Sequence, residues 1–166
     1  PVGFWLPKTY AVAATPVAAL FTIMTKVGIY AILRVNGTVF NDELGQSILS
    51  HTLLIIGLIT SLYGVIGAIG VDRLRRFVGF MILSSIGTIL VAFSMMNEAA
   101  WSAGLYYLVH STIIAASFYL LCGWITSQRG ALKDHLKIAP KMKQDKIIAA
   151  SFFLIALMMA GLPPFS

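Results

Sequence analysis

The stretch TPVAALFTIMTKVGIYAILRV, residues 15–35, contains a lysine, Lys26, in the middle of a run whose other polar residues are threonines, a tyrosine and an arginine near its end. The hydrocarbon core of a bilayer is about 30 Å thick, so an α-helix needs about 20 mostly apolar residues to cross it. Lys26 lies about ten residues into the run, or roughly 15 Å along a helix, which is close to the middle of a membrane. The stretch therefore predicts a transmembrane helix with an ionisable group near its centre.

The whole chain has the composition of a membrane protein. Of its 166 residues, 58% are hydrophobic and 11% are charged, and the mean hydropathy is +0.88. A soluble domain is about half apolar and about a quarter charged. The net charge is +6, and the charged residues lie almost entirely between the apolar runs. This placement is typical of membrane topology and argues against nucleic-acid binding. A single cysteine, Cys122, provides no disulfide framework or metal cluster, and no cofactor is expected.

Five apolar runs predict an all-α, integral membrane helical bundle. They cover residues 16–35, 50–71, 77–96, 99–126 and 147–162. Residues suited to N-caps precede four of them: Thr15, Asp72, Asn97 and Asp145. Pro163 and Pro164 lack an amide donor and are expected to break the last helix. We expect residues 1–166 to form a single transmembrane domain that is a fragment of a larger subunit.

The positive charges predict an orientation for this bundle. Ten of the twelve Lys and Arg residues lie before the first run or in two loops, residues 72–76 and 127–146, which fall on one side of the membrane. Arg34 lies on the other side, and Lys26 lies between the two sides. By the positive-inside bias, the two basic loops are expected to be cytoplasmic.

Lys26 is the charge that this topology does not explain. A charged lysine at a helix centre costs about 2.5 to 3.5 kcal/mol on insertion scales. Ionisable groups within membranes usually belong to ion or proton pathways, which predicts a transport role; the alternative is a neutral or paired lysine that only holds helices together. Thr22 and Tyr30 lie one turn to either side, so the three residues predict a polar stripe.

His110 is a second titratable group, near the middle of the fourth run. Its imidazole can exchange protons near neutral pH, which predicts a second proton-relay residue, and a histidine that only packs against a hydroxyl is the alternative. Further hydroxyl groups are candidates for lining a hydrated path: Ser84, Ser85, Thr88, Ser111 and Ser117. Small residues at helical spacing in the second run instead predict close helix packing: Gly57, Ser61, Gly64 and Ala68.

Four separated segments resemble a known family. They are GFWLPKTYAVAATPVAALFTIMTKVGIYAILR (residues 3–34), VDRLRRFVGFMILSSIGTIL (71–90), GLYYLVHSTIIAASFYLLCG (104–123) and GLPPFS (161–166). In this order they resemble the proton-conducting, antiporter-like membrane subunits of respiratory complex I and of the multisubunit Mrp (Pha) cation/proton antiporters, in particular the D subunit of the latter.

The resemblance implies that protons move along a row of titratable residues at the membrane midplane. Lys26 matches the family's central lysine, and His110 matches the first histidine of a pair that many members carry. Ser111 and Ala115 stand where those members have the second histidine and a lysine, and Ser85 stands where some have another histidine. These replacements argue against a strongly charged relay in the fourth run.

The same resemblance implies the setting in which the chain works. It implies a transporter subunit rather than an enzyme, in a bacterial inner membrane. Its expected partners are other membrane subunits, the lipid bilayer, protons and monovalent cations such as Na⁺ or K⁺. Two alternatives stay open. One is a proton-pumping subunit of complex I or a related hydrogenase complex, and the other is a helical scaffold that conducts no ions.

Overall fold

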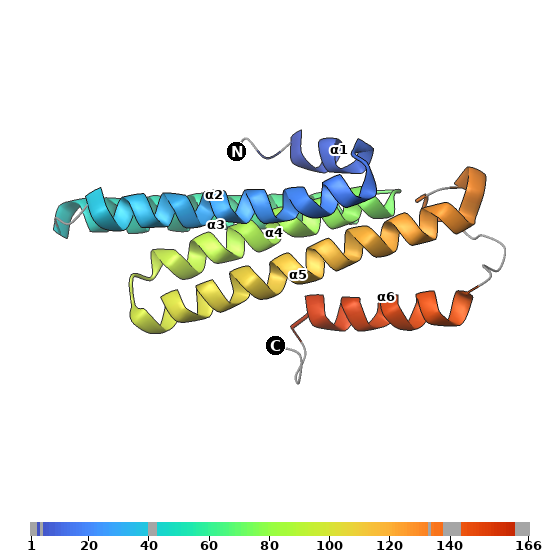
Figure 1. The fold of residues 1–166 in the computed structure, drawn as a ribbon. Helices are drawn as coiled ribbons and strands as arrows, with labels where there is room; N and C mark the ends of the chain where they lie inside the picture. Colours follow the sequence, from blue (N-terminus) through green and yellow to red (C-terminus); the bar gives the residue numbers. More distant parts are fainter. Residues whose placement is uncertain (1–2, 4, 40–42, 133, 138–143, 162–166) are drawn as a thin grey trace.

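The chain folds into long helices that run side by side, as the computed structural model in Figure 1 shows for residues 3, 5–39, 43–132, 134–137 and 144–161. The elements in chain order are α1 (Trp5–Val12), α2 (Thr15–Val39), α3 (Glu43–Ile69), α4 (Leu74–Ser94), α5 (Glu98–Arg129), the short 3₁₀ helix η1 (Gly130–Leu132) and α6 (Asp145–Met159). Within these described ranges, the extended pairing is limited to an isolated bridge between Arg73 and His135. The prediction of an all-α membrane bundle is confirmed.

Four of the helices are long and apolar enough to cross a membrane. These segments are Thr15–Val35, Gly45–Ile69, Leu74–Ser94 and Glu98–Arg129, and each overlaps one of the first four predicted runs. The fifth run forms α6, whose 15 residues extend about 22 Å at the helical rise. α6 ends where Gly161 adopts a left-handed conformation, with φ of 69°, as glycine commonly does after a helix. Pro163 and Pro164 lie outside the described residues, so the break predicted there stays a prediction.

The short helix α1 is absent from the sequence-based prediction. Its eight residues are too few to show a clear period, and they include Pro7, which a helix tolerates in its first turn. α1 buries Leu6, Pro7 and Tyr10 and packs against α4. It lies along the half of α4 that begins at Leu74 (Figure 1).

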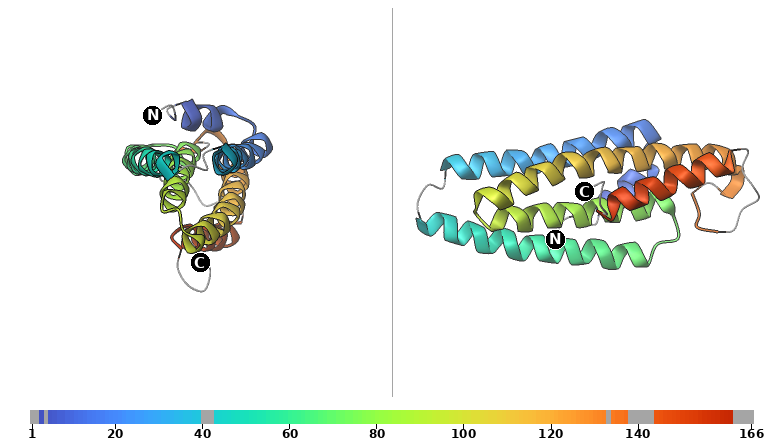
Figure 2. Two further views of the ribbon diagram at one scale, coloured as in Figure 1. Left: turned by 90° about the vertical axis from the view of Figure 1, so that its left-hand side faces the viewer. Right: turned by 90° about the horizontal axis from the view of Figure 1, so that it is seen from below.

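The order of the helices across the bundle follows from their contacts. α4 packs against both α3 and α5, and α2 packs against α5 (Figure 2). α3 and α4 approach so closely that a Cβ atom added to Gly87 would lie 2.4 Å from the backbone nitrogen of Ser61. A Cβ atom on Gly64 would lie 2.5 Å from the nitrogen of Ser84. The packing role predicted for the small residues of α3 is therefore confirmed.

The interior contains two apolar clusters with a polar layer between them. The larger cluster includes Ala18 of α2, Val78 and Ile82 of α4, and Phe118 and Tyr119 of α5. The smaller cluster consists of four residues further along α2 and α4: Ile29, Leu33, Ile89 and Phe93. Between the two clusters, each of the three helices buries polar side chains: Thr22 and Lys26 in α2, Ser85 in α4 and Ser111 in α5.

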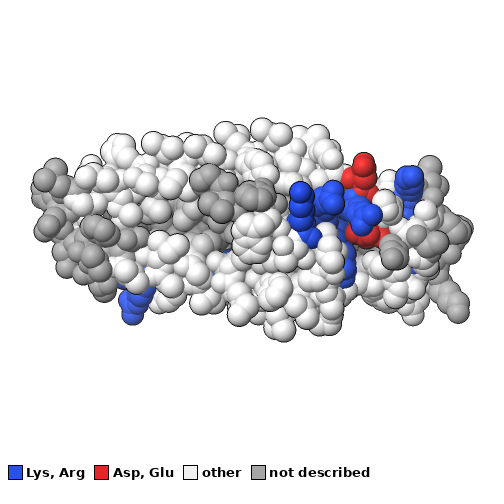
Figure 3. Space-filling view, turned by 90° about the horizontal axis from the view of Figure 1, so that it is seen from above, with Lys and Arg blue, Asp and Glu red and all other residues white. Residues whose placement is uncertain are grey.

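The two basic loops meet at one end of the bundle. The backbone N–H of Leu74 donates to the carbonyl of Asp134 at 2.8 Å, and that of Leu136 donates to the carbonyl of Asp72 at 2.9 Å. Figure 3 shows Lys and Arg side chains gathered towards one end of the face that it presents. The described parts of both loops therefore share one end. The predicted loop residues Lys133, Lys141 and Lys143 lie outside the described residues.

Of the four predicted N-caps, Asn97 is confirmed. Its side chain accepts a hydrogen bond from the backbone N–H of Ala100 at 2.6 Å. The other three predictions are wrong. α2 and α6 begin at Thr15 and Asp145 themselves, and Arg73 precedes α4 without a capping side chain. At α4, a backbone bond from the second basic loop takes the place of a local cap, which a local sequence pattern does not reveal.

Candidate functional site

Lys26 lies on the buried face of α2. The buried residues of this helix recur every three or four positions, as expected for one face of an α-helix: Ala18, Ala19, Thr22, Lys26, Ile29 and Leu33. The side chain of Lys26 is 1% exposed, so neither lipid nor bulk water reaches it in this bundle. The central lysine that the sequence places at mid-membrane depth is therefore also enclosed by protein.

The ammonium of Lys26 binds the neighbouring helix α5. Its Nζ donates to Oγ of Ser111 at 2.7 Å, and this hydroxyl donates in turn to the carbonyl of Tyr107 at 2.5 Å. The bond joins residues that are 85 positions apart in the chain. Lys26 and Ser111, which are two separate candidates from the sequence, are thus in direct contact.

No acidic side chain pairs with Lys26 among the described residues. Of the six Asp and Glu residues of the chain, the five that the structure describes lie at helix ends or between helices, and one of them, Glu98, is the first residue of a membrane-spanning segment: Glu43, Asp72, Glu98, Asp134 and Asp145. An ion in a low-dielectric interior is costly unless a partner charge or several hydrogen bonds stabilise it. The ammonium has three N–H groups, and the described residues provide a single hydrogen bond. The Lys26 ammonium is therefore held by a single neutral partner, the Ser111 hydroxyl.

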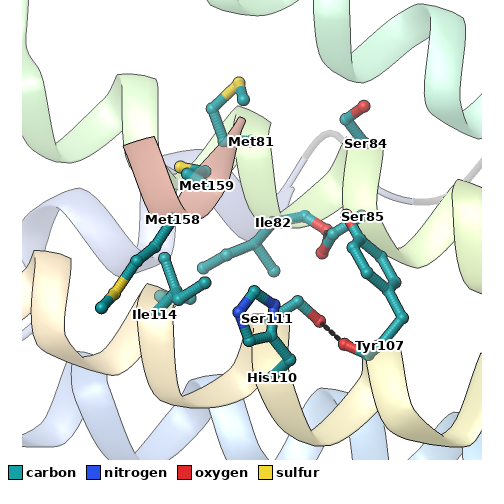
Figure 4. Close-up of a pocket in the computed structure, with 11 residues that line it drawn as sticks. Met81, Ile82, Ser84, Ser85, Tyr107, His110, Ser111, Ile114, Met158 and Met159 are labelled. Atoms are coloured by element: carbon teal, nitrogen blue, oxygen red, sulfur yellow. Dashed lines mark hydrogen bonds between the residues drawn. The ribbon is translucent and has the colours of Figure 1, made fainter. Parts of the chain in front are cut away.

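A small cavity that Ser111 helps to line lies between α4, α5 and α6 (Figure 4). Its volume is about 50 Å³. Since one water molecule needs roughly 10 to 15 Å³ measured in this way, there is room for about three to five. The lining residues are Met81, Ile82, Ser84, Ser85, Tyr107, His110, Ser111, Ile114, Ala115, Met158 and Met159. Ser111 therefore contacts both Lys26 and a space that can hold water.

His110 lies in the wall of this cavity, directly before Ser111 in α5. Its half-buried ring stacks on Tyr106, with 5.9 Å between ring centroids and 12° between ring planes. Figure 4 shows the imidazole beside Ser111 and Ile114. Lys26 thus bonds to one residue of the cavity wall, Ser111, and His110 is another residue of the same wall. Ala115, at the position where the resemblance expects a lysine in many members, is part of the same wall.

The structure separates the other candidate residues into two groups. Ser84 and Ser85 line the cavity, and Thr22 is fully buried one turn before Lys26. Tyr30, Thr88 and Ser117 are absent from the cavity wall. Tyr30 is 43% exposed, because residues eight apart on a 3.6-residue helix differ in direction by about 80°. The predicted polar stripe therefore includes Thr22 and Lys26 and does not extend to Tyr30.

Several wall residues are not among the sequence-based candidates. Met158 and Met159 come from the end of α6, and Met81, Ile82 and Ile114 add apolar surface. Apolar residues within apolar runs give no local signal of this role. Among the described residues, no group of three or more His, Cys, Asp or Glu side chains is arranged to hold a metal ion. The chemistry that the site offers is that of an amine, an imidazole and hydroxyl groups.

The chain is similar to known membrane proteins along its whole length. All of residues 1–166 match the family described as "NADH:quinone oxidoreductase/Mrp antiporter, TM". The chain is 33% identical to the D subunit of a probable K(+)/H(+) antiporter from Rhizobium meliloti (strain 1021), over 100% of this chain and 34% of that protein. It is 34% identical to the D subunit of a Na(+)/H(+) antiporter from Alkalihalophilus pseudofirmus, over 100% of this chain and 33% of that protein.

A solved structure shares the fold. A chain in "Structure of Mrp complex from Dietzia sp. DQ12-45-1b" superposes with a TM-score of 0.83 at 31% sequence identity. The superposition covers 98% of this chain and 30% of that chain. The present chain therefore spans about a third of the length of the curated relatives and solved structure that it matches.

Proposed function

Because the chain belongs to the NADH:quinone oxidoreductase/Mrp antiporter transmembrane family, we propose that it is part of a proton-translocating membrane subunit of a multisubunit Na⁺(K⁺)/H⁺ antiporter. The observation that carries this proposal is the buried Lys26 ammonium, bound at 2.7 Å to a hydroxyl that also lines a cavity with His110. The names of the relatives, which mention K⁺, Na⁺ and H⁺, support an antiporter over a subunit of a redox-driven complex.

Proton transfer from Lys26 can proceed through Ser111. The Ser111 hydroxyl first turns away from the carbonyl of Tyr107, to which it donates in this structure. Its oxygen then takes a proton from the ammonium while its own proton passes to water in the cavity, so Ser111 is neutral before and after. His110 can then accept the proton on a ring nitrogen. A second positive charge about 10 Å away would repel protonated Lys26 by roughly 1.7 kcal/mol at an effective dielectric constant of 20, and so favour proton release. A row of such sites can pass charge along the membrane plane.

The test of this function is cation/proton exchange driven by a pH gradient in everted vesicles that contain the assembled complex. Lys26→Ala is expected to abolish exchange while the amount of assembled subunit stays normal. Selectivity between Na⁺ and K⁺ is assigned to other segments or subunits, since the described Asp and Glu residues lie at helix ends or between helices, and none of them is in the middle of a span to coordinate a bare cation. The remaining partners are proposed to be other membrane subunits of a hetero-oligomeric complex and the surrounding lipid.

His110 is expected to tune exchange rather than carry it. His110→Ala should slow exchange by roughly threefold to tenfold and shift its pH optimum, because cavity water can replace one imidazole as proton acceptor. The measurement is the exchange rate against pH in everted vesicles. His51→Ala, at an exposed position of α3, is the matched control and should leave the profile unchanged. Complete loss of exchange in a normally assembled His110→Ala complex would contradict the tuning role.

Labelling of single cysteines tests the proposed bacterial inner-membrane orientation, with both basic loops cytoplasmic. Arg76 and Lys137 are exposed at the end of the bundle where the loops meet, so Arg76→Cys and Lys137→Cys are suitable sites. Arg75 is less suitable because its guanidinium donates to the carbonyl of Ala13 at 3.1 Å. A membrane-impermeant maleimide should label both positions in everted vesicles and neither in intact cells. The natural Cys122 is buried, so it should add little background labelling. Labelling of either introduced cysteine from outside the cell would contradict the proposed orientation.

A further inference from the structure

The helix α1 inserts a tyrosine into the half of the bundle between Lys26 and the basic loops. Tyr10 is 1% exposed, and its ring stacks on Phe21 with 5.9 Å between centroids and meets Tyr119 edge-on at 5.8 Å. Its hydroxyl donates to the carbonyl oxygen of Phe21 at 2.8 Å. Phe21 precedes Lys26 by five residues, or about 7.5 Å along the helix axis. The phenol therefore places a polar group deep in the larger apolar cluster.

Other hydroxyl groups continue from Tyr10 in both directions. Towards Lys26, Thr25 donates to the same Phe21 carbonyl at 3.3 Å, so the hydroxyls of Thr25 and Tyr10 lie next to each other. Thr25 also bonds the carbonyl of Thr22 at 3.1 Å, one turn from Lys26. In the opposite direction, the hydroxyl of Tyr119 donates to the carbonyl of Arg75 at 3.4 Å. Three hydroxyl groups, each bound to a backbone carbonyl, thus lie in a region that is otherwise apolar, and the rings of Tyr10 and Tyr119 are in contact.

The outer end of this series is Arg75, at the start of α4. Its guanidinium donates to the carbonyl of Ala13, after α1, and to the hydroxyl of Thr15, at the start of α2. Its Nε–H is buried and has no hydrogen-bond partner among the described residues. The titratable groups that face this region are Tyr119 and Cys122 of α5. Asp134, after α5, is the acidic residue close to Cys122.

Packing alone does not require the phenol hydroxyl. A phenylalanine would fill almost the same volume, and the Phe21 carbonyl already accepts a backbone hydrogen bond within α2. Burying a hydroxyl costs free energy that its hydrogen bond only offsets. The hydroxyl groups of Tyr10, Thr25 and Tyr119 nonetheless all occur along one direction, from the end of the bundle to the turn that precedes Lys26.

We propose that the Tyr10 hydroxyl is a proton-transfer step between Lys26 and the end of the bundle where α1 meets the basic loops. Once each hydroxyl has turned away from the carbonyl to which it donates, the Tyr10 oxygen accepts a proton from the Tyr119 hydroxyl while its own O–H proton passes to the Thr25 hydroxyl. Thr25 passes a proton on to the neutral Lys26 amine, and water at the end of the bundle resupplies Tyr119, so the three hydroxyl groups are neutral before and after. Transfer in the opposite direction reverses these movements. This inference rests on the proposed function, since it adds a route to Lys26 from one face of the membrane.

The test is Tyr10→Phe in the full-length subunit within its complex. Exchange is measured while the pH on the α1 face is varied and the pH on the other face is held constant, and then in the reverse arrangement. Tyr10→Phe should slow exchange by roughly tenfold, since water replaces the hydroxyl only in part. It should also shift the pH dependence on the α1 face alone. A purely structural role would lower the rate equally for both faces.

Two further variants make the outcome decisive. Thr25→Val removes the next hydroxyl at nearly constant volume and should reproduce the one-sided shift even if Tyr10→Phe assembles poorly. Tyr63→Phe, on α3 and 44% exposed, is the matched control and should change nothing. Normal rates and pH profiles for Tyr10→Phe and Thr25→Val, alongside loss of exchange in Lys26→Ala, would overturn the Tyr10 route and leave the proposed function intact. Normal exchange in Lys26→Ala would overturn the proposed function itself.

Discussion

Lys26→Arg is expected to leave little or no cation/proton exchange, although it retains the positive charge. Guanidinium stays protonated under all physiological conditions, so it cannot release and rebind a proton in each cycle. It is also bulkier than an amine, at a position that is 1% exposed and bound to Ser111. We expect the rate to fall by a factor of at least about 100, the size of effect typical of a lost proton-transfer group.

The measurement is exchange per assembled complex in everted vesicles, with Lys26→Ala and Lys26→Arg compared side by side. Lys8→Ala removes an exposed lysine of α1 and is the control, expected to retain exchange. The scaffold hypothesis makes the opposite prediction. If Lys26 only donates hydrogen bonds between helices, arginine should restore much of the activity, and alanine should reduce assembly and exchange together. Near-normal exchange with alanine would end the relay proposal.

Gly87→Ala is expected to prevent assembly of the subunit. The added Cβ would lie 2.4 Å from the backbone nitrogen of Ser61 and 2.6 Å from the carbonyl oxygen of Gly57. Backbone atoms in the middle of α3 cannot move aside without separating α3 from α4. Overpacking of a core costs about 1 to 3 kcal/mol and sometimes more, and contact with backbone rather than with a flexible side chain favours the upper part of that range.

The measurement is the amount of intact complex on a native gel. Gly64→Ala should behave in the same way, since its Cβ would lie 2.5 Å from the backbone nitrogen of Ser84. Gly28→Ala is the matched control, because it lies in a membrane-spanning helix with no atom within 4 Å of the added Cβ. Normal amounts of intact Gly87→Ala complex would show that α3 and α4 separate more easily than their contact indicates.

The parts of the fold that follow from the length and period of apolar runs are predictable from the sequence. α2 to α5 are such helices, and the depth of Lys26 follows from its place in one of them. The pairing of Lys26 with Ser111 has no such local signal, since it depends on how α2 and α5 are rotated about their axes. Tyr30 shows a related limit. Spacing at i, i+4 places two residues on the same side of a helix over one turn, but over two turns the direction drifts by about 80°, so Tyr30 no longer shares the face of Thr22.

The helix α1 and the start of α4 could not be predicted from local sequence, because contacts with distant parts of the chain determine them. α1 is held by contacts with α4 rather than by its own eight residues, so neither the helix nor the burial of Tyr10 is visible in a local pattern. The start of α4 likewise depends on a backbone bond to Asp134, sixty residues along the chain from Leu74. The cavity wall combines three helices, and its methionines resemble any other apolar residue of a membrane span.

The polar layer between two apolar clusters also has an electrical consequence. A membrane voltage falls mainly across regions of low polarisability, which here are the two clusters on either side of Lys26. A proton that moves within the layer, from Lys26 towards His110, stays at nearly constant potential and does almost no work against the voltage. A proton that passes Tyr10 crosses about half of the voltage drop, or roughly 1 kcal/mol per 100 mV. Voltage should therefore act on the entry of protons into the layer and hardly at all on their movement along it.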